Sequence, residues 1–90
     1  MNTYTDQGLY TLPELTEMVL SENLRQLKKW GTQCRTPFEW MTYLTEEVGE
    51  AAEAISEHEY REGTKAQVVK ELIQVATLAL KMAEFYRESK

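Results

Sequence analysis

Beyond Pro37 the chain contains no further proline and only two glycines, Gly49 and Gly63. Glycine and proline are the residues that most often interrupt helices and strands, so their scarcity leaves this part of the chain few places to turn. Asp6 is the only aspartate among the 15 acidic residues. The other acids are glutamates, which tolerate helix interiors better than aspartate does. These features predict a mostly helical protein of the all-α class.

Signals for helix ends divide the chain into three helices. Pro13 suits the first turn of a helix, and Gly31 suits the end of one. The run Thr36–Glu39 matches a capping box with proline at the first helical position. Gly63 is expected to end the second helix, and Thr64 to cap the third. We expect an N-terminal arm over residues 1–10 and helices over about 13–30, 37–62 and 65–88, all within a single domain of residues 1–90.

The third predicted helix carries more apolar surface than one neighbouring helix can cover. Its apolar positions span roughly 240° of an ideal helix, whereas packing on one layer needs a stripe only somewhat wider than about 100°. The turn at Gly63 is short, so the second and third helices must form an antiparallel hairpin. A three-helix chain has too little protein to bury the remaining surface. We therefore expect a homo-oligomer, most simply one with two-fold symmetry.

Two glutamates fall among apolar residues when side chains are placed at about 100° intervals around each helix. Glu47 lies within the apolar side of the second helix, between Trp40 and Tyr43 in angle. Glu71 lies inside the apolar arc of the third helix. Each has an oxygen donor three residues later on the same helix face, and these donors are Glu50 and Gln74.

Buried carboxylates on two packed helices require a compensating partner. An unpaired buried carboxylate costs several kcal/mol or becomes protonated, and two of them repel each other. Mg²⁺ prefers oxygen ligands and would resolve both problems. The alternative is structural: E-x-x-E is common on solvated helices, and Glu71 has Lys70, Lys81 or an arginine as possible ion-pair partners. The residues alone leave both interpretations open.

The same segments resemble a known family. Glu46-Glu47-Val48-Gly49-Glu50 matches the E-E-x-x-E signature of the MazG-like, all-alpha nucleoside triphosphate pyrophosphohydrolases. Glu71-Leu72-Ile73-Gln74 stands where that family usually has E-x-x-D, and the segments Lys29–Gln33 and Pro37–Trp40 resemble its lead-in. The resemblance runs from about Arg25 to Glu84, roughly two-thirds of the chain.

The resemblance implies a fold and an activity. It implies a four-helix-bundle-type assembly built as a homodimer or homotetramer. It also implies Mg²⁺-dependent hydrolysis of a nucleoside triphosphate, ribo or deoxyribo, to the monophosphate and pyrophosphate, with water attacking the α-phosphorus. By motif position, Glu47, Glu50 and Glu71 are the implied metal ligands, Gln74 occupies the fourth ligand position, and Glu46 supports the site or orients the water. Mn²⁺ is the expected substitute ion.

Basic and aromatic residues near the expected mouth of the site are candidates for substrate binding. Lys28, Lys29 and Arg35 are candidates for phosphate contacts, and Trp30 and Trp40 for stacking on a base. Ordinary packing or solvation is the alternative for each of them.

Gln74 is the departure from the family pattern. A neutral amide replaces a carboxylate there. Its carbonyl oxygen can still bind Mg²⁺, but less tightly than a carboxylate oxygen does, because one negative charge is missing. The enzyme would then work with fewer metals, act on a shifted substrate, or have lost catalysis. The alternative function is accordingly a non-catalytic nucleotide-sensing or helical interaction module.

Composition excludes several other classes. The formal net charge is −5, which disfavours a nucleic-acid groove or an anionic membrane surface as partner. No apolar run is long enough to span a membrane, and the first residues lack the features of a signal peptide. The single cysteine, Cys34, cannot form an internal disulfide and fits a reducing compartment, so we expect a cytoplasmic protein.

Overall fold

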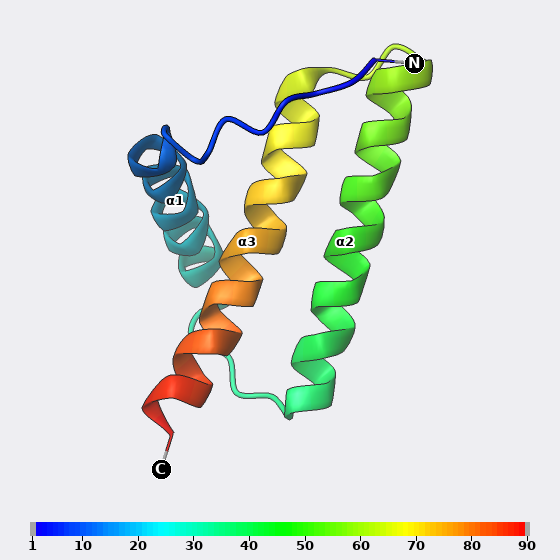
Figure 1. The fold of residues 1–90 in the computed structure, drawn as a ribbon. Coiled ribbons are helices and arrows are strands. Elements are labelled where there is room, and N and C mark those ends of the chain that lie inside the picture. Colours follow the sequence, from blue (N-terminus) through cyan, green and yellow to red (C-terminus); the bar gives the residue numbers. More distant parts are fainter. Residues whose placement is uncertain (1, 90) are drawn as a thin grey trace.

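The protein is all-helical over residues 2–89, the part of the chain that its computed structural model describes. It consists of α1 (Leu12–Trp30), α2 (Pro37–Tyr60) and α3 (Lys65–Glu88), with no strand among the described residues (Figure 1). The prediction of three helices and an all-α class is confirmed. Residues 2–7 form an arm without regular structure, and Tyr4 Oη in this arm donates a hydrogen bond of 2.6 Å to Glu59 Oε2.

The caps expected from the sequence define the starts of α2 and α3. Thr36 Oγ1 accepts a hydrogen bond from the Glu39 backbone N–H at 3.2 Å, and Glu39 Oε1 accepts one from the Thr36 N–H at 2.9 Å. This is a complete capping box, which satisfies backbone donors that the helix itself leaves free. Thr64 Oγ1 likewise accepts from the Gln67 N–H at 3.1 Å. Both α2 and α3 therefore begin at a residue fixed by local hydrogen bonding.

The turn between α2 and α3 begins two residues earlier than the sequence predicts. α2 ends at Tyr60, not at residue 62, because the chain leaves helical geometry at Arg61 and folds back over the last turn. The Gly63 N–H donates to Glu57 O at 3.0 Å, and the His58 ring nitrogen Nδ1 lies 2.9 Å from Gly63 O. A Cβ atom at residue 63 would lie 2.8 Å from the backbone of Glu57 and of His58. Only glycine allows this close approach.

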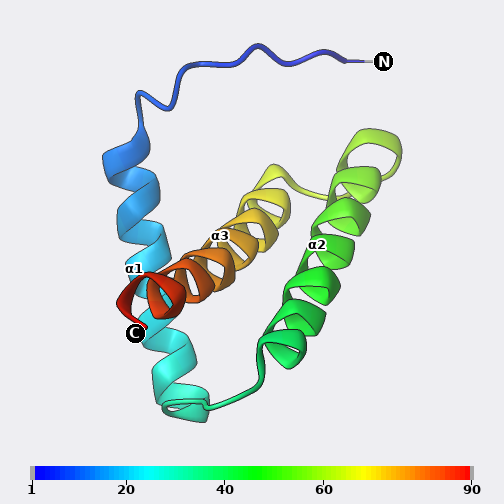
Figure 2. The ribbon, with the colours of Figure 1, turned by 60° about the horizontal axis from the view of Figure 1, so that its bottom comes forward.

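The three helices form a hairpin with a third helix on one side. α2 and α3 run antiparallel and pack along their lengths, and α1 packs against α3 alone, without close backbone contacts to α2 (Figures 1 and 2). α1 crosses α3 at a steep angle instead of lying parallel to it (Figure 2).

The core of a single chain is small. Among residues 2–89 only Ala51, Ala54, Thr77 and Leu78 are buried. The chain exposes 7427 Å², whereas a compact monomer of 10.5 kDa exposes about 5,400 Å². Its radius of gyration is 14.6 Å, against about 12 Å for a compact domain of this length. Much apolar surface remains uncovered, although no described helix is both long and apolar enough to cross a membrane.

Removing the cap of α2 tests the local basis of the fold. Thr36→Ala deletes the hydroxyl that accepts from the Glu39 N–H, and we expect it to lower the free energy of unfolding by about 1 kcal/mol. Thr45→Ala is the control, because the Thr45 hydroxyl bonds only to Met41 O within the same helix. Urea unfolding followed by circular dichroism measures both variants. Equal effects of the two substitutions would show that the capping box contributes nothing.

Candidate metal and nucleotide site

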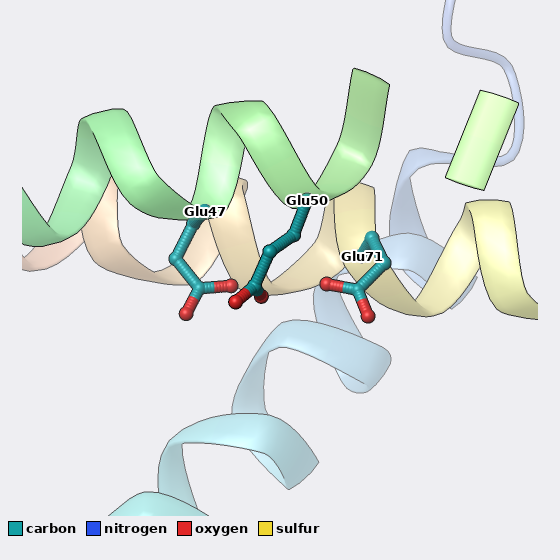
Figure 3. Close-up of side chains that lie close together, drawn as sticks. All are labelled: Glu47, Glu50 and Glu71. Carbon is teal, nitrogen blue, oxygen red and sulfur yellow. The ribbon is translucent and has the colours of Figure 1, made fainter. Parts of the chain in front are cut away.

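Three carboxylates from α2 and α3 converge at the hairpin. Glu47 and Glu50 are three residues apart on α2 and share a helix face, and Glu71 reaches them from α3 (Figure 3). Each offers one carboxylate oxygen, and these oxygens lie within 4.8 Å of one another. Glu47 and Glu71 are half-buried and Glu50 is exposed. The sequence pattern had placed Glu47 and Glu71 among apolar residues and Glu50 three residues after Glu47 on the same helix face.

The carboxamide of Gln74 lies between two of these carboxylates. Hydrogen bonding is satisfied only when its nitrogen faces them, and this orientation places Nε2 3.0 Å from Glu47 Oε2 and 3.0 Å from Glu71 Oε2. Glu71 also accepts a hydrogen bond of 2.7 Å at Oε1 from Gln67 Nε2. Gln74 therefore stands at the fourth position of the cluster as a hydrogen-bond donor.

The cluster has no ion-pair partner in the part of the chain that the structure describes. Between residues 2 and 89, none of the three glutamates forms an ion pair with a lysine, arginine or histidine. Lys81, one of the alternative partners considered for Glu71, instead donates from Nζ to Gln26 Oε1 at 2.7 Å. Burial raises the pKa of Glu47 above its usual range, and the neighbouring charges of Glu50 and Glu71 raise it further.

The donor set fits Mg²⁺. Bonds of about 2.1 Å place opposite ligands of an octahedral ion about 4.2 Å apart. Carboxylate oxygens within 4.8 Å of one another are therefore close to the spacing that one ion requires. The donors are all oxygen, as hard divalent ions prefer. Mn²⁺ prefers the same ligand type and suits the site equally.

A cleft of about 330 Å³ opens beside the cluster, and all three helices line it. Glu47 and Gln74 form one end of its lining, and Trp30, Trp40 and Tyr43 provide aromatic surface. The guanidinium of Arg25 lies 5.6 Å from the centre of the Trp30 ring, and that of Arg35 lies 4.9 Å from the centre of the Tyr43 ring. The cleft thus combines flat apolar surfaces with two cations beside an acidic cluster.

A chain of hydrogen bonds fixes the α1 side of this cleft. Arg25 donates to both oxygens of Glu22, at 2.9 and 2.7 Å. Gln26 Nε2 donates to Glu22 Oε2 at 2.7 Å, and Gln26 Oε1 accepts from Lys81 on α3. Glu22, Arg25 and Gln26 were not predicted as site residues from the sequence. Their i, i+3, i+4 spacing is a detectable signal, but only the packing of α1 on α3 shows which way they face.

The structure brings together some of the predicted substrate residues. Trp30, Arg35 and Trp40 line the cleft, as expected of a binding site. Lys28 and Lys29 are not part of its lining, and the ammonium group of Lys29 lies 4.7 Å from the Trp30 ring centre.

Glu46 has an exposed side chain and lies outside the group of converging carboxylates. Its role in orienting water stays a prediction.

A second, larger groove borders the cluster at the turn of the hairpin. Its volume is about 830 Å³, and its acidic lining includes Glu50, Glu53, Glu57, Glu62 and Glu71. It has no aromatic residue on which a base could stack. The smaller aromatic cleft is therefore the better candidate for a nucleotide.

Comparisons of the chain with protein-family models, with curated proteins and with solved structures found no match.

The raised pKa of Glu47 has a consequence for stability. A folded-state pKa above the unfolded value means that the folded protein binds the proton more tightly, so the free energy of unfolding falls as pH rises through the folded-state pKa. In ion-free buffer we expect Glu47→Gln to stabilise the protein at about pH 7, with the gain disappearing at about pH 4, near the ordinary glutamate pKa of about 4.3.

Thermal unfolding in EDTA at both pH values measures this effect. Glu53→Gln is the matched control on the same helix, outside the cluster. A gain for Glu47→Gln that is equal at both pH values would contradict the assigned cause.

Proposed function

We propose that this chain is a MazG-like, Mg²⁺-dependent nucleoside triphosphate pyrophosphohydrolase. The observation that carries the proposal is the position of the cluster: three carboxylates without an ion-pair partner among the described residues converge, and one of them, Glu47, also lines a cleft with aromatic and guanidinium groups. A triphosphate carries a flat base and a chain of anionic groups, so it needs both kinds of surface. The E-E-x-x-E sequence and its order with the second motif support the same assignment.

Each part of the site has a role in the proposed reaction. Glu47, Glu50 and Glu71 hold the ion. When bound, Mg²⁺ supplies charge neutralisation at the phosphates, polarises the phosphoryl oxygen and lowers the pKa of a water.

The remaining roles belong to the cleft and its margin. Trp30 and Trp40 offer faces on which a base stacks, and the guanidinium groups of Arg25 and Arg35 offer donors to phosphate oxygens. Glu46 is proposed to orient the attacking water. Positioning and charge stabilisation are most of what phosphoryl transfer requires.

A specific observation favours a second candidate function, a non-catalytic nucleotide-sensing module. Gln74 contributes no negative charge to the cluster, and its amide nitrogen faces two of the carboxylates. A cluster with less charge binds a divalent ion less tightly, while the aromatic cleft is unaffected. Nucleotide binding without turnover would fit this alternative.

The uncovered surface supports a homo-oligomer of the four-helix-bundle type. The chain exposes about 2,000 Å² more than a compact monomer of its mass would. On α2, Met41, Val48 and Ile55 are seven residues apart, share one face and are 42–49 % exposed. Leu72 and Tyr86 are exposed apolar residues of α3. Two hairpins packed through these residues form a four-helix homodimer, and two such dimers a homotetramer. We propose that the oligomer acts in the cytoplasm.

Product analysis tests the activity. The protein is incubated with Mg²⁺, and separately with Mn²⁺, against ribo- and deoxyribonucleoside triphosphates. We expect nucleoside monophosphate and pyrophosphate from the wild type. Glu47→Gln removes a charged ligand, and we expect turnover to fall at least about 100-fold.

Glu53→Gln is the control and is expected to keep full turnover. Full activity in both Glu47→Gln and Glu71→Gln would show that the site is wrongly placed. Nucleotide binding without any product, with either ion, would favour the sensing module.

Light scattering coupled to size exclusion tests the assembly. We expect a mass at least twice the 10.5 kDa of one chain, and a monomer for Val48→Arg, because the new charge would be buried in the interface. Thr42→Arg places the same side chain on an exposed position of α2 outside that face and is expected to leave the oligomer intact. A wild-type protein that remains monomeric would contradict this interface.

A further inference from the structure

We propose that Lys81 is a positioning residue for substrate binding. It acts on Arg25, whose guanidinium it holds in the cleft through the side chains of Gln26 and Glu22. Arg25 in turn binds a phosphate group of the substrate. The inference rests on the proposed function, because it takes the cleft to be the place where a triphosphate binds.

Lys81 is a half-buried lysine on α3. Lysine usually keeps its ammonium group in water, because burying a charge without a partner is costly. Burial lowers the pKa of Lys81, and the charge of Glu22 opposes this shift. Within residues 2–89 Lys81 forms no ion pair, and its Nζ instead donates to the neutral Gln26 Oε1 at 2.7 Å. A costly charge is therefore placed where it bonds to an amide of α1.

Gln26 has one orientation in this arrangement. An ammonium group only donates hydrogen bonds, and an ionised carboxylate only accepts them. The amide oxygen therefore faces Lys81, and the amide nitrogen donates to Glu22 Oε2 at 2.7 Å. Reversing the amide would lose both bonds. Lys81 thus determines which group Gln26 presents to Glu22.

Glu22 passes this constraint on to Arg25. The Glu22 side chain is 9 % exposed, and hydrogen bonds from Arg25 and Gln26 lower its pKa, so it is ionised at neutral pH. Arg25 Nε and Nη2 donate to its two oxygens at 2.9 and 2.7 Å. A paired contact of this kind fixes the plane of a guanidinium as well as its position.

The remaining edge of the Arg25 guanidinium can receive a phosphate. A guanidinium has five N–H donors, and Glu22 takes only two of them. Arg25 lines the cleft, 5.6 Å from the centre of the Trp30 ring. Hydrogen bonds to Glu22 raise the pKa of Arg25, and the charge of Glu47 raises it further, so Arg25 also lies near the carboxylate cluster. A base on Trp30 with its phosphates at the cluster brings phosphate oxygens close to these donors.

Lys81 itself stands outside the cleft. It lines a neighbouring groove together with Gln26 and Trp30, and it is not part of the cleft lining. It therefore reaches a bound triphosphate only through other side chains. A substitution of Lys81 is expected to weaken triphosphate binding only while Arg25 is present.

Binding of triphosphates that cannot react tests this dependence. The probes are the α,β-methylene analogues of ATP and CTP, one purine and one pyrimidine, titrated with Mg²⁺ by calorimetry. We expect Lys81→Met and Arg25→Met each to bind at least about tenfold more weakly than the wild type, the factor for one hydrogen bond to a charged group. The double variant is expected to bind no more weakly than Arg25→Met alone. Losses that multiply in the double variant would overturn the inference.

Lys70→Met is the matched control on α3. After the hydrogen bonds from Arg25 and Gln26, the charge of Lys70 also lowers the pKa of Glu22, but the Gln26 oxygen accepts its hydrogen bond from Lys81. We expect Lys70→Met to bind the analogues as the wild type does. A loss equal to that of Lys81→Met would show that charge near Glu22, and not the chain of hydrogen bonds, is responsible. Methionine also removes the cost of burying an ammonium, so Lys81→Met is expected to fold, which circular dichroism checks.

The ligand-free protein provides a second test. Nuclear magnetic resonance of ¹⁵N-labelled protein follows the Nε–H proton of Arg25, which donates to Glu22 Oε1. We expect this proton to exchange with water several times faster in Lys81→Met than in the wild type, and at the wild-type rate in Lys70→Met. An unchanged rate in Lys81→Met would show that Lys81 does not hold Arg25.

The outcomes separate this inference from the proposed function. If the wild type forms product but Lys81→Met binds the analogues as tightly as the wild type, the proposed function stands and this inference fails. If the wild type forms no product yet binds the analogues with the expected dependence on Lys81 and Arg25, the proposed hydrolysis fails and this inference stands.

Discussion

The close packing of α2 against α3 is the constraint on which the rest of the structure depends. The buried side chains at this contact include Ala51 and Ala54 on α2, and small side chains let two helices approach each other closely. Thr77 is 1 % exposed, and its hydroxyl bonds to Ile73 O within α3, so it needs no partner across the contact. This approach forces carboxylates from both helices into one region. Burial of Glu47 and its repulsion by Glu50 and Glu71 are costs of the packing, and together they raise the pKa of Glu47.

The features predicted well from the sequence depend on neighbours along the chain. The capping box at Thr36 and the cap at Thr64 are four-residue patterns, so reading them needs no tertiary information. The placement of Glu47 and Glu71 among apolar residues follows from helical angle once the helices are known. The end of α2 was misjudged because it depends on the fold-back of the turn, in which Gly63 contacts the backbone of Glu57.

The α1 side of the cleft shows the opposite case. Periodicity predicts that α1 is helical, but it does not give the angle at which α1 crosses α3. The bond between Gln26 and Lys81 joins residues 55 positions apart, and no local pattern connects them. Glu22 and Arg25 were therefore missed, whereas Trp30 and Trp40 were found because aromatic residues are candidates in any binding site. The orientation of the Gln74 amide is likewise a tertiary property, since it depends on carboxylates from two helices.

Because α1 packs on α3 alone, the carboxylate cluster and one wall of the neighbouring cleft belong to different parts of the molecule. The carboxylates belong to the hairpin, and their spacing is set by the α2–α3 contact, to which α1 contributes nothing. One wall of the cleft belongs to α1, through residues such as Glu22, Arg25 and Trp30, and residues of α2 and α3 line the rest. Changes on that wall alter what fits beside the cluster without moving it. The carboxylate cluster and the α1 wall of the cleft can thus change independently of each other in this fold.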